Sequence, residues 1–288
     1  MQHLGAGRGL QLLHGPIDLV VRAEGEDGAV RAAYERAVAA FEPVLADLVQ
    51  ELGFLRAPVG SLPYVPVGPV ARRMQAAATG VDCFVTPMAA VAGAVADHIL
   101  ATMLEADDLD RAIVNNGGDI AVHLRGDQRF LLGVSDYVRK DQHAGIITLA
   151  AKSGVGGVAT SGWRGRSHSL GVADAVTVLA ATAAEADVLA TLIANVVDVP
   201  GSVRIARSPA SSLAPDSDLG ARLVTVDVAP LTPHEVAQAL DAGAARARHF
   251  VAAGRAISVF IALQGETRII GDGIAAASLQ PNRQLEVI

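Results

Sequence analysis

Residues 112–124 read Ala-Ile-Val-Asn-Asn-Gly-Gly-Asp-Ile-Ala-Val-His-Leu, which places two strand-like runs on either side of a Gly-Gly pair. Branched and apolar side chains favour extended backbone, and two glycines allow the chain to turn tightly between them. We therefore predict strands at 112–115 and 120–124, joined by a turn.

The chain on both sides of this segment mixes strands and helices without strict alternation. Gly126-Asp127 predicts a hairpin into a strand at 130–134, and Gln264-Gly265 predicts a second hairpin. Thr182 and Thr232 are predicted helix N-caps, Thr86-Pro87 is predicted to open another helix, and Pro43 is expected to divide the helix at 30–52. The remaining predicted strands are 17–22, 146–151, 155–160, 172–180, 222–228, 256–262 and 266–270, and the helices are 30–52, 70–78, 86–105, 183–197 and 233–253. Segments 56–69 and 207–218 are predicted loops.

Strands in runs with helices set irregularly between them favour an α+β fold, a mostly antiparallel layered sheet with packed helices, over a doubly wound parallel one. The 288 residues contain 51% hydrophobic residues, enough for a substantial core. No break in composition divides the chain, so we predict a single domain over 1–288.

The overall charge argues against some partners. A formal net charge of -7 offers no basic surface for nucleic acid or an anionic membrane. A bound phosphate must therefore be held locally, by backbone N–H groups, a few arginines or a metal. Cys83 is the only cysteine, which leaves no intramolecular disulfide. With no leader-like segment and no long apolar run, the chain is predicted to be cytoplasmic and not membrane-bound. The sequence leaves a homo-oligomer open.

The Gly-Gly turn is the first candidate site. Gly117 and Gly118 let the backbone approach a ligand and present successive N–H donors, with Asn116 before them and the Asp119 carboxylate after them. The alternative interpretation is a tight turn closed by an Asn or Asp side chain.

The second candidate is Thr160-Ser161-Gly162-Trp163, at the end of a predicted strand. The hydroxyls and the glycine N–H can hold a phosphate or a ring carbonyl, and Trp163 can stack on a planar ring. Arg164 and Arg166 follow and can pair with phosphate. The alternative is a polar turn with a partly buried tryptophan and solvated arginines.

The third candidate lies on the helix at 183–197. Asp187 and Thr191 are four residues apart, so they share one face and can give two oxygen ligands to Mg²⁺ or Ca²⁺. The alternative is a surface acid beside a threonine bonded to its own helix. Histidine titrates near neutral pH, so His168 is a candidate for proton transfer, with an ordinary loop histidine as the alternative. His98, beside Asp97, is interpreted as structural.

In this order the segments resemble the motifs of the ApbE superfamily of FAD:protein FMN transferases. Characterised members show a helix start with Asp-Leu-Gly-x-x-x-Lys-Gly, an Asn-x-Gly-Gly-Asp-Ile turn, Ala-Thr-Ser-Gly plus an aromatic residue, a histidine loop, and Ala-Asp-Ala-Leu-Ala-Thr. The corresponding stretches here are 88–97, at a helix start, then 115–120, 159–163, 166–171 and 186–191. The resemblance covers residues 86–196 well, and its most detailed match is to an uncharacterised branch of the superfamily.

The resemblance implies a T-fold-like architecture, with FAD and Mg²⁺ as cofactors and a small-molecule nucleotide as the partner. Asp187 and Thr191 would hold Mg²⁺ beside the FAD pyrophosphate, and His168 would lie near the bond to be broken. The residues that would bind the flavin nucleotide are Asn116, Gly117, Gly118, Asp119, Thr160, Ser161, Gly162 and Trp163.

Two departures leave the reaction open. Ala92-Gly93 stands where transferases carry Lys-Gly, and Ser167-His168-Ser169-Leu170-Gly171 replaces a His-x-x-Asp-Pro-x-Thr-Gly loop. One hypothesis is FMN transfer or cleavage of the FAD pyrophosphate with a divalent metal. The others are a non-catalytic ligand-binding protein on the same fold, and an enzyme that acts on an unrelated small molecule.

Overall fold

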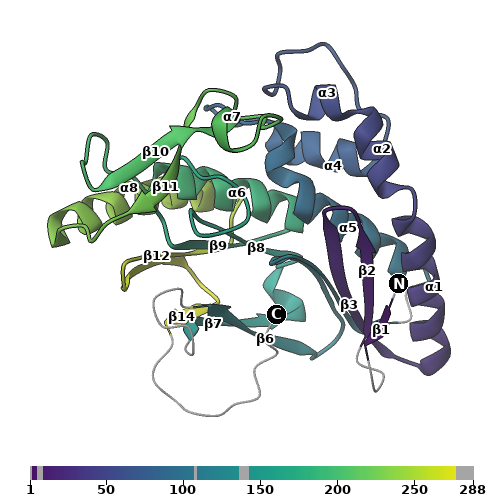
Figure 1. The fold of residues 1–288 in the computed structure, drawn as a ribbon. Helices are drawn as coiled ribbons and strands as arrows, with labels where there is room; N and C mark the ends of the chain where they lie inside the picture. The colour runs from purple at the N-terminus through teal and green to yellow at the C-terminus, as the bar shows by residue number, and fades with distance from the viewer. Residues whose placement is uncertain (1, 5–8, 107–108, 136–142, 277–288) are drawn as a thin grey trace. The chain divides into compact units, whose positions relative to one another are not determined.

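A computed structural model describes residues 2–4, 9–106, 109–135 and 143–276 of the chain (Figure 1). The chain divides into two compact units. The first comprises Met1–Arg129, Ala150–Ala159 and Ala180–Val188, and the second comprises Phe130–Leu149, Thr160–Leu179 and Leu189–Ile288. The single domain over 1–288 stays a prediction.

The first unit is built on antiparallel strands that neighbour one another in the order β1-β2-β3-β4-β5-β8. These are β1 (Gln2–Leu4), β2 (Gly9–His14), β3 (Ile17–Gly25), β4 (Leu109–Asn116), β5 (Asp119–Leu124) and the beginning of β8 (Gly157–Ser161). Asn116 pairs with Asp119, so Gly117 and Gly118 alone form the loop between β4 and β5. Their φ angles of 67° and 112° are ones that side chains rarely adopt, which explains both glycines.

The first unit also contains a group of helices, of which the first and the last contact these strands. They are α1 (Asp27–Phe41), α2 (Val44–Gln50), α3 (Leu52–Leu55), α4 (Pro69–Ala78), the 3₁₀ turn η1 (Pro87–Ala90) and α5 (Val91–Met103). Pro43 separates α1 from α2, as predicted. Helix α5 contacts α1, β4 and β5. The helix expected from Thr86 begins as a 3₁₀ turn, for which the Thr86 side chain forms no capping hydrogen bond.

The second unit contains β9 (Ala175–Ala180), β12 (Ser258–Leu263) and β13 (Glu266–Gly271), which pair antiparallel in that order. Helix α8 (Pro233–Ala252) contacts β12 and β13. The cap predicted at Thr232 is a full capping box, in which Thr232 and Glu235 each accept the other's backbone N–H. Gln264 and Gly265 form the predicted turn, at φ 47° and 89°.

Two predictions for this part of the chain were wrong. Strand β6 (Arg129–Ser135) lies beside β7 (His143–Ala150) in a three-stranded sheet with β14 (Ile274–Ala276), so the turn at Gly126 does not close the predicted hairpin. The predicted loop 207–218 contains most of β10 (Ile205–Pro209) and α7 (Ala210–Leu213), because β10 pairs with β11 (Leu223–Val228). The α+β, mostly antiparallel class is confirmed.

Helix α6 (Ala183–Val196) begins in the first unit and ends in the second. Its N-terminus is capped as predicted, because the Thr182 hydroxyl accepts the Glu185 N–H at 3.2 Å. The helix is rich in fully buried alanine and leucine, so its backbone approaches its neighbours closely. In the described ranges, no helix is long and apolar enough to cross a bilayer.

Candidate functional site

The carboxylate of Asp187 lies at the start of a second helix. It projects from α6, and its Oδ2 accepts the backbone N–H of Gly93 at 3.1 Å, in the first turn of α5. The α5 N-cap residue is Ala90, which has no side-chain acceptor. Asp187 therefore supplies from a distance of 94 residues the acceptor that a local cap would normally provide.

Asp97 caps the start of α6 from α5. It lies on α5, and its two carboxylate oxygens accept the N–H groups of Ala183 at 3.0 Å and Ala184 at 2.9 Å, in the first turn of α6. Each helix thus carries an aspartate that caps the start of the other. Gly93 allows this close approach, because a Cβ there would lie 2.2 Å from the carbonyl oxygen of Ala183.

The Gly-Gly hairpin is joined to the same place. Asn116 is buried, and its Nδ2 donates to the carbonyl oxygen of Ala92 at 3.1 Å. The Gly118 N–H donates to Oδ1 of Asn115 at 2.8 Å. The turn is therefore closed by an Asn side chain, and one of the two N–H groups expected to face a ligand is already used.

Asp119 is a further side chain of the candidate site in the first unit. Loss of hydration is the main cause that raises the pKa of the Asp187 carboxyl well above its usual range, and the charge of Asp119 is the next. Asp97 acts in the same direction, and the N–H groups of Gly93 and Ala92 oppose it. Two predicted site residues from distant stretches of chain, Asp119 and Asp187, thus lie near enough to destabilise each other's charge.

The repulsion between Asp119 and Asp187 should lower the free energy of unfolding by a measurable amount. With its raised pKa, Asp187 lowers the free energy of unfolding above its own folded pKa, and this cost disappears below its unfolded pKa. Asp187→Asn keeps an acceptor for Gly93 and removes the charge. We expect it to raise the free energy of unfolding by about 1–2 kcal/mol at pH 7 without divalent metal, and by much less at about pH 3. Urea unfolding at both pH values measures this, and a loss of stability at pH 7 would contradict it.

The carboxylates of the candidate site fit one kind of metal site better than another. In the part of the chain that the structure describes, no three His, Cys, Asp or Glu side chains are grouped to hold an ion. A closed protein cage is therefore not formed there. Mg²⁺ usually binds through one or two carboxylates together with substrate phosphates and water. The pair of Asp119 and Asp187 fits that second kind of site.

Other predicted site residues lie in the second unit. Thr160 is exposed, and its hydroxyl pairs with that of Thr177 at 2.9 Å, while Ser161 is half-buried. Gly162 has a packing role, since a Cβ there would lie 2.6 Å from the carbonyl oxygen of Asp174. Thr191 is half-buried on α6 and His168 is exposed.

Trp163 is half-buried, and its indole Nε1 is a buried donor without a hydrogen-bond partner among the described residues. The guanidinium of Arg164 lies 4.3 Å from the ring centre, so it covers one face of the indole. Arg164 also pairs with the buried Asp174 at 2.8 Å. Arg164 therefore also has a structural role, while its side chain is exposed.

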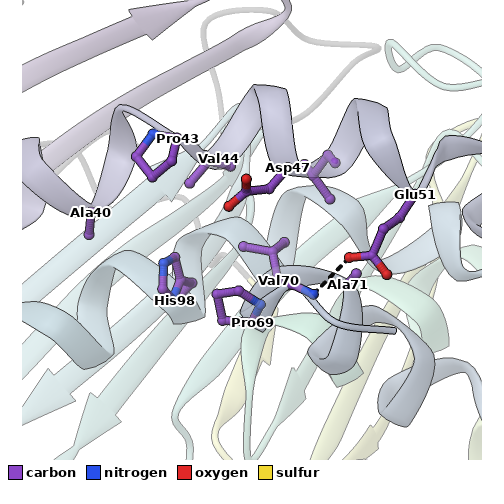
Figure 2. A pocket seen from close by; sticks show the side chains of 11 residues that line it. Ala40, Pro43, Val44, Asp47, Glu51, Pro69, Val70, Ala71 and His98 are labelled. Carbon is purple, nitrogen blue, oxygen red and sulfur yellow. Dashed lines mark hydrogen bonds between the residues drawn. The ribbon is translucent and has the colours of Figure 1, made fainter. Parts of the chain in front are cut away.

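A cavity of about 170 Å³ lies elsewhere on the first unit (Figure 2). It is lined by α1, α2, α4 and α5 and by none of the predicted site residues.

Sequence reasoning missed Asp97 and the backbone of Ala92 and Gly93 as parts of this site. A signal for Asp97 was present, because it is a carboxylate in an otherwise apolar helix and such a group needs partners when buried. Its position did not reveal that the partners lie 86 and 87 residues further along the chain.

Comparison with known proteins identifies the family. The family model described as "AbpE bacteria" matches residues 1–269, and the chain belongs to this family. The resemblance to ApbE proteins is therefore confirmed.

Individual relatives match only part of the chain. The chain is 37% identical to the UPF0280 protein of Methanothrix thermoacetophila over 145 residues, 50% of this chain and 58% of that protein. It is 37% identical to the UPF0280 protein of Archaeoglobus fulgidus over 115 residues, 39% of this chain and 45% of that protein. The chain thus spans about half the length of these curated relatives.

Two solved structures align with the chain. The apo form of the flavinyl transferase ApbE of Pseudomonas stutzeri aligns with 67% of this chain and 85% of that chain, at 14% identity and a TM-score of 0.40. The ApbE protein of Thermotoga maritima aligns with 86% and 77%, at 18% identity and a TM-score of 0.39.

Proposed function

We propose that this chain binds a flavin nucleotide together with a divalent cation at the start of α5, beside the Gly117–Gly118 turn. The observation that carries the proposal is the position of Asp187, held against the first turn of α5 and close to Asp119. Membership of the family supports flavin as the ligand class.

The geometry also supports a need for the cation. A helix N-terminus commonly binds phosphate directly through its N–H groups. Here Asp187 already accepts the N–H of Gly93, so a phosphate would approach a negative group instead. A divalent cation bound by Asp187 and Asp119 would join the carboxylates to the diphosphate and neutralise charge on its oxygens.

The residues of the second unit complete the proposal. Thr191, one helical turn after Asp187, is proposed as a further oxygen ligand of the cation. Thr160, Ser161, Gly162 and Trp163 are proposed to bind the nucleotide, and His168 is proposed to act at the pyrophosphate. Substitution of the binding residues in a titration with FAD tests the first role, and AMP release in His168→Ala tests the second.

Isothermal titration with FAD tests the proposal. We expect FAD to bind at least tenfold more tightly with Mg²⁺ than with EDTA, and Asp187→Ala to remove this difference. The matched control is Asp110→Asn, which changes an exposed carboxylate on β4 and should keep the Mg²⁺ dependence. No flavin binding in either buffer, or an equal Mg²⁺ effect in Asp187→Ala, would show the proposal to be wrong.

A second candidate function is binding without catalysis. It is favoured by Ala92-Gly93, which lacks the lysine of the transferases and uses its backbone to hold Asp187 and Asn116 instead. The exposed position of His168 points the same way. Incubation with FAD and Mg²⁺, followed by mass analysis for AMP, separates the two functions. Release of AMP that is lost in His168→Ala would establish cleavage or transfer, and binding without AMP would establish the second function.

A further inference from the structure

The cavity of Figure 2 is formed where Pro43 interrupts the helix between α1 and α2. Its walls are mainly apolar. The apolar residues that line the cavity are Ala40, Pro43, Val44, Leu48, Val70 and Ala71. Its volume of about 170 Å³ is close to the roughly 150 Å³ that holds a benzene molecule in an engineered protein cavity. The space therefore suits a ligand of about six non-hydrogen atoms.

Three ionisable side chains also line the cavity: Asp47, Glu51 and His98. Glu51 is already satisfied, because it accepts the Tyr64 hydroxyl at 2.9 Å and the N–H groups of Val67 at 2.9 Å and Gly68 at 2.7 Å. It thus holds the loop before α4 in place. Glu51 has a structural role there.

Asp47 and His98 are different, since neither side chain has a hydrogen-bond partner among the described residues. In Figure 2 the Asp47 carboxylate points from α2 toward the space that His98 borders from α5. Loss of hydration lowers the pKa of His98, and Arg73 acts the same way, against Asp47 and Glu105. The lowered pKa favours the neutral imidazole, which offers one nitrogen as an acceptor.

The cavity thus offers a carboxylate and an imidazole, neither with a hydrogen-bond partner among the described residues, within mainly apolar walls. We infer that it binds a short primary alkylammonium ion. The ammonium group would donate to Asp47 and to His98, and the alkyl chain would lie against Val44, Leu48 and Val70. A metal ion fits less well, because no group of three His, Cys, Asp or Glu side chains is arranged for one in the described ranges.

Titration of ¹⁵N-labelled protein with pentylammonium chloride tests this inference, with sodium chloride added to keep ionic strength constant. We expect saturable shifts confined to residues around the cavity. Asp47→Asn should raise the dissociation constant at least tenfold, and the matched control Asp110→Asn should change it less than twofold. 1-Pentanol, which has the same chain without the charge, should bind at least tenfold more weakly than pentylammonium. His98→Phe, which keeps an apolar ring, should weaken binding at least threefold.

The same ammonium chemistry occurs in free amines and in lysine side chains, and a second ligand separates them. Tighter binding of Nα-acetyl-lysine N-methylamide than of pentylammonium would assign the cavity to a lysine of a partner chain, and the reverse would assign it to a free amine. Shifts spread over the whole surface, equal binding of pentanol, or unchanged binding in both Asp47→Asn and His98→Phe would overturn the inference.

Discussion

Gly93→Ala should lower the free energy of unfolding by about 3 kcal/mol or more. The added Cβ would lie 2.2 Å from the oxygen and 2.4 Å from the carbon of the Ala183 carbonyl. Both atoms are backbone, so no side-chain rotation can relieve the overlap. The start of α6 would have to move away from α5, which would lengthen the hydrogen bonds of Asp97 to Ala183 and Ala184. The loss in free energy of unfolding should therefore be at the upper end of the range that overpacked substitutions show.

Helix propensity predicts the opposite sign, since alanine is better than glycine in a helix by about 1 kcal/mol. Gly53→Ala is the matched control, because Gly53 is exposed on α3 and a Cβ there meets nothing within 4 Å. Urea unfolding should show Gly53→Ala to be neutral or slightly stabilising. If Gly93→Ala behaves like Gly53→Ala, the close approach of α5 and α6 is wrong.

Local signals explain which parts of the fold were predictable. The Gly117–Gly118 turn, the capping box at Thr232 and the break at Pro43 each depend on a few neighbouring residues, and all three are present. The pairing of β6 depends on residues far away in the sequence. Gly126 does turn the chain, yet the next strand lies beside β7. Strand β10 was missed for the same reason, because its polar and proline-containing sequence becomes a strand only through β11.

The candidate site shows the same difference between local signals and contacts that are distant in the sequence. Only Asn116 was named as a site residue, and its Nδ2 donates to the carbonyl of Ala92, whereas the neighbouring Asn115 closes the turn. Asp187 was predicted from its motif, whereas its partner Gly93 was mentioned only beside Ala92, which replaces the lysine of the family pattern. Side chains that act over 86 to 94 residues leave no periodic or spacing signal. Burial of a charge in an apolar helix, as at Asp97, is the remaining clue.

Asp97→Ala should lower the free energy of unfolding by about as much as Gly93→Ala does, for a different reason. Asp97 is buried and is the acceptor for the first two N–H groups of α6. Without it these donors lose their partners in an apolar setting, at about 1–3 kcal/mol each. We expect a total loss of about 3 kcal/mol. Asp97→Asn should lose less, because its amide keeps one acceptor, and Thr182→Ala should lose about 1 kcal/mol, because it removes a single exposed cap.

Asp97 is also a positioning residue for the proposed cation site, because it fixes the first turn of the helix that carries Asp187. This part rests on the proposed function. In Asp97→Asn, which should remain folded, the affinity for FAD with Mg²⁺ should fall at least fivefold while the affinity in EDTA changes little. A purely structural role would lower both affinities together or neither. Equal stability of Asp97→Ala and Thr182→Ala would instead contradict the capping of α6 by Asp97, since the larger loss depends on two buried donors and the smaller on one exposed donor.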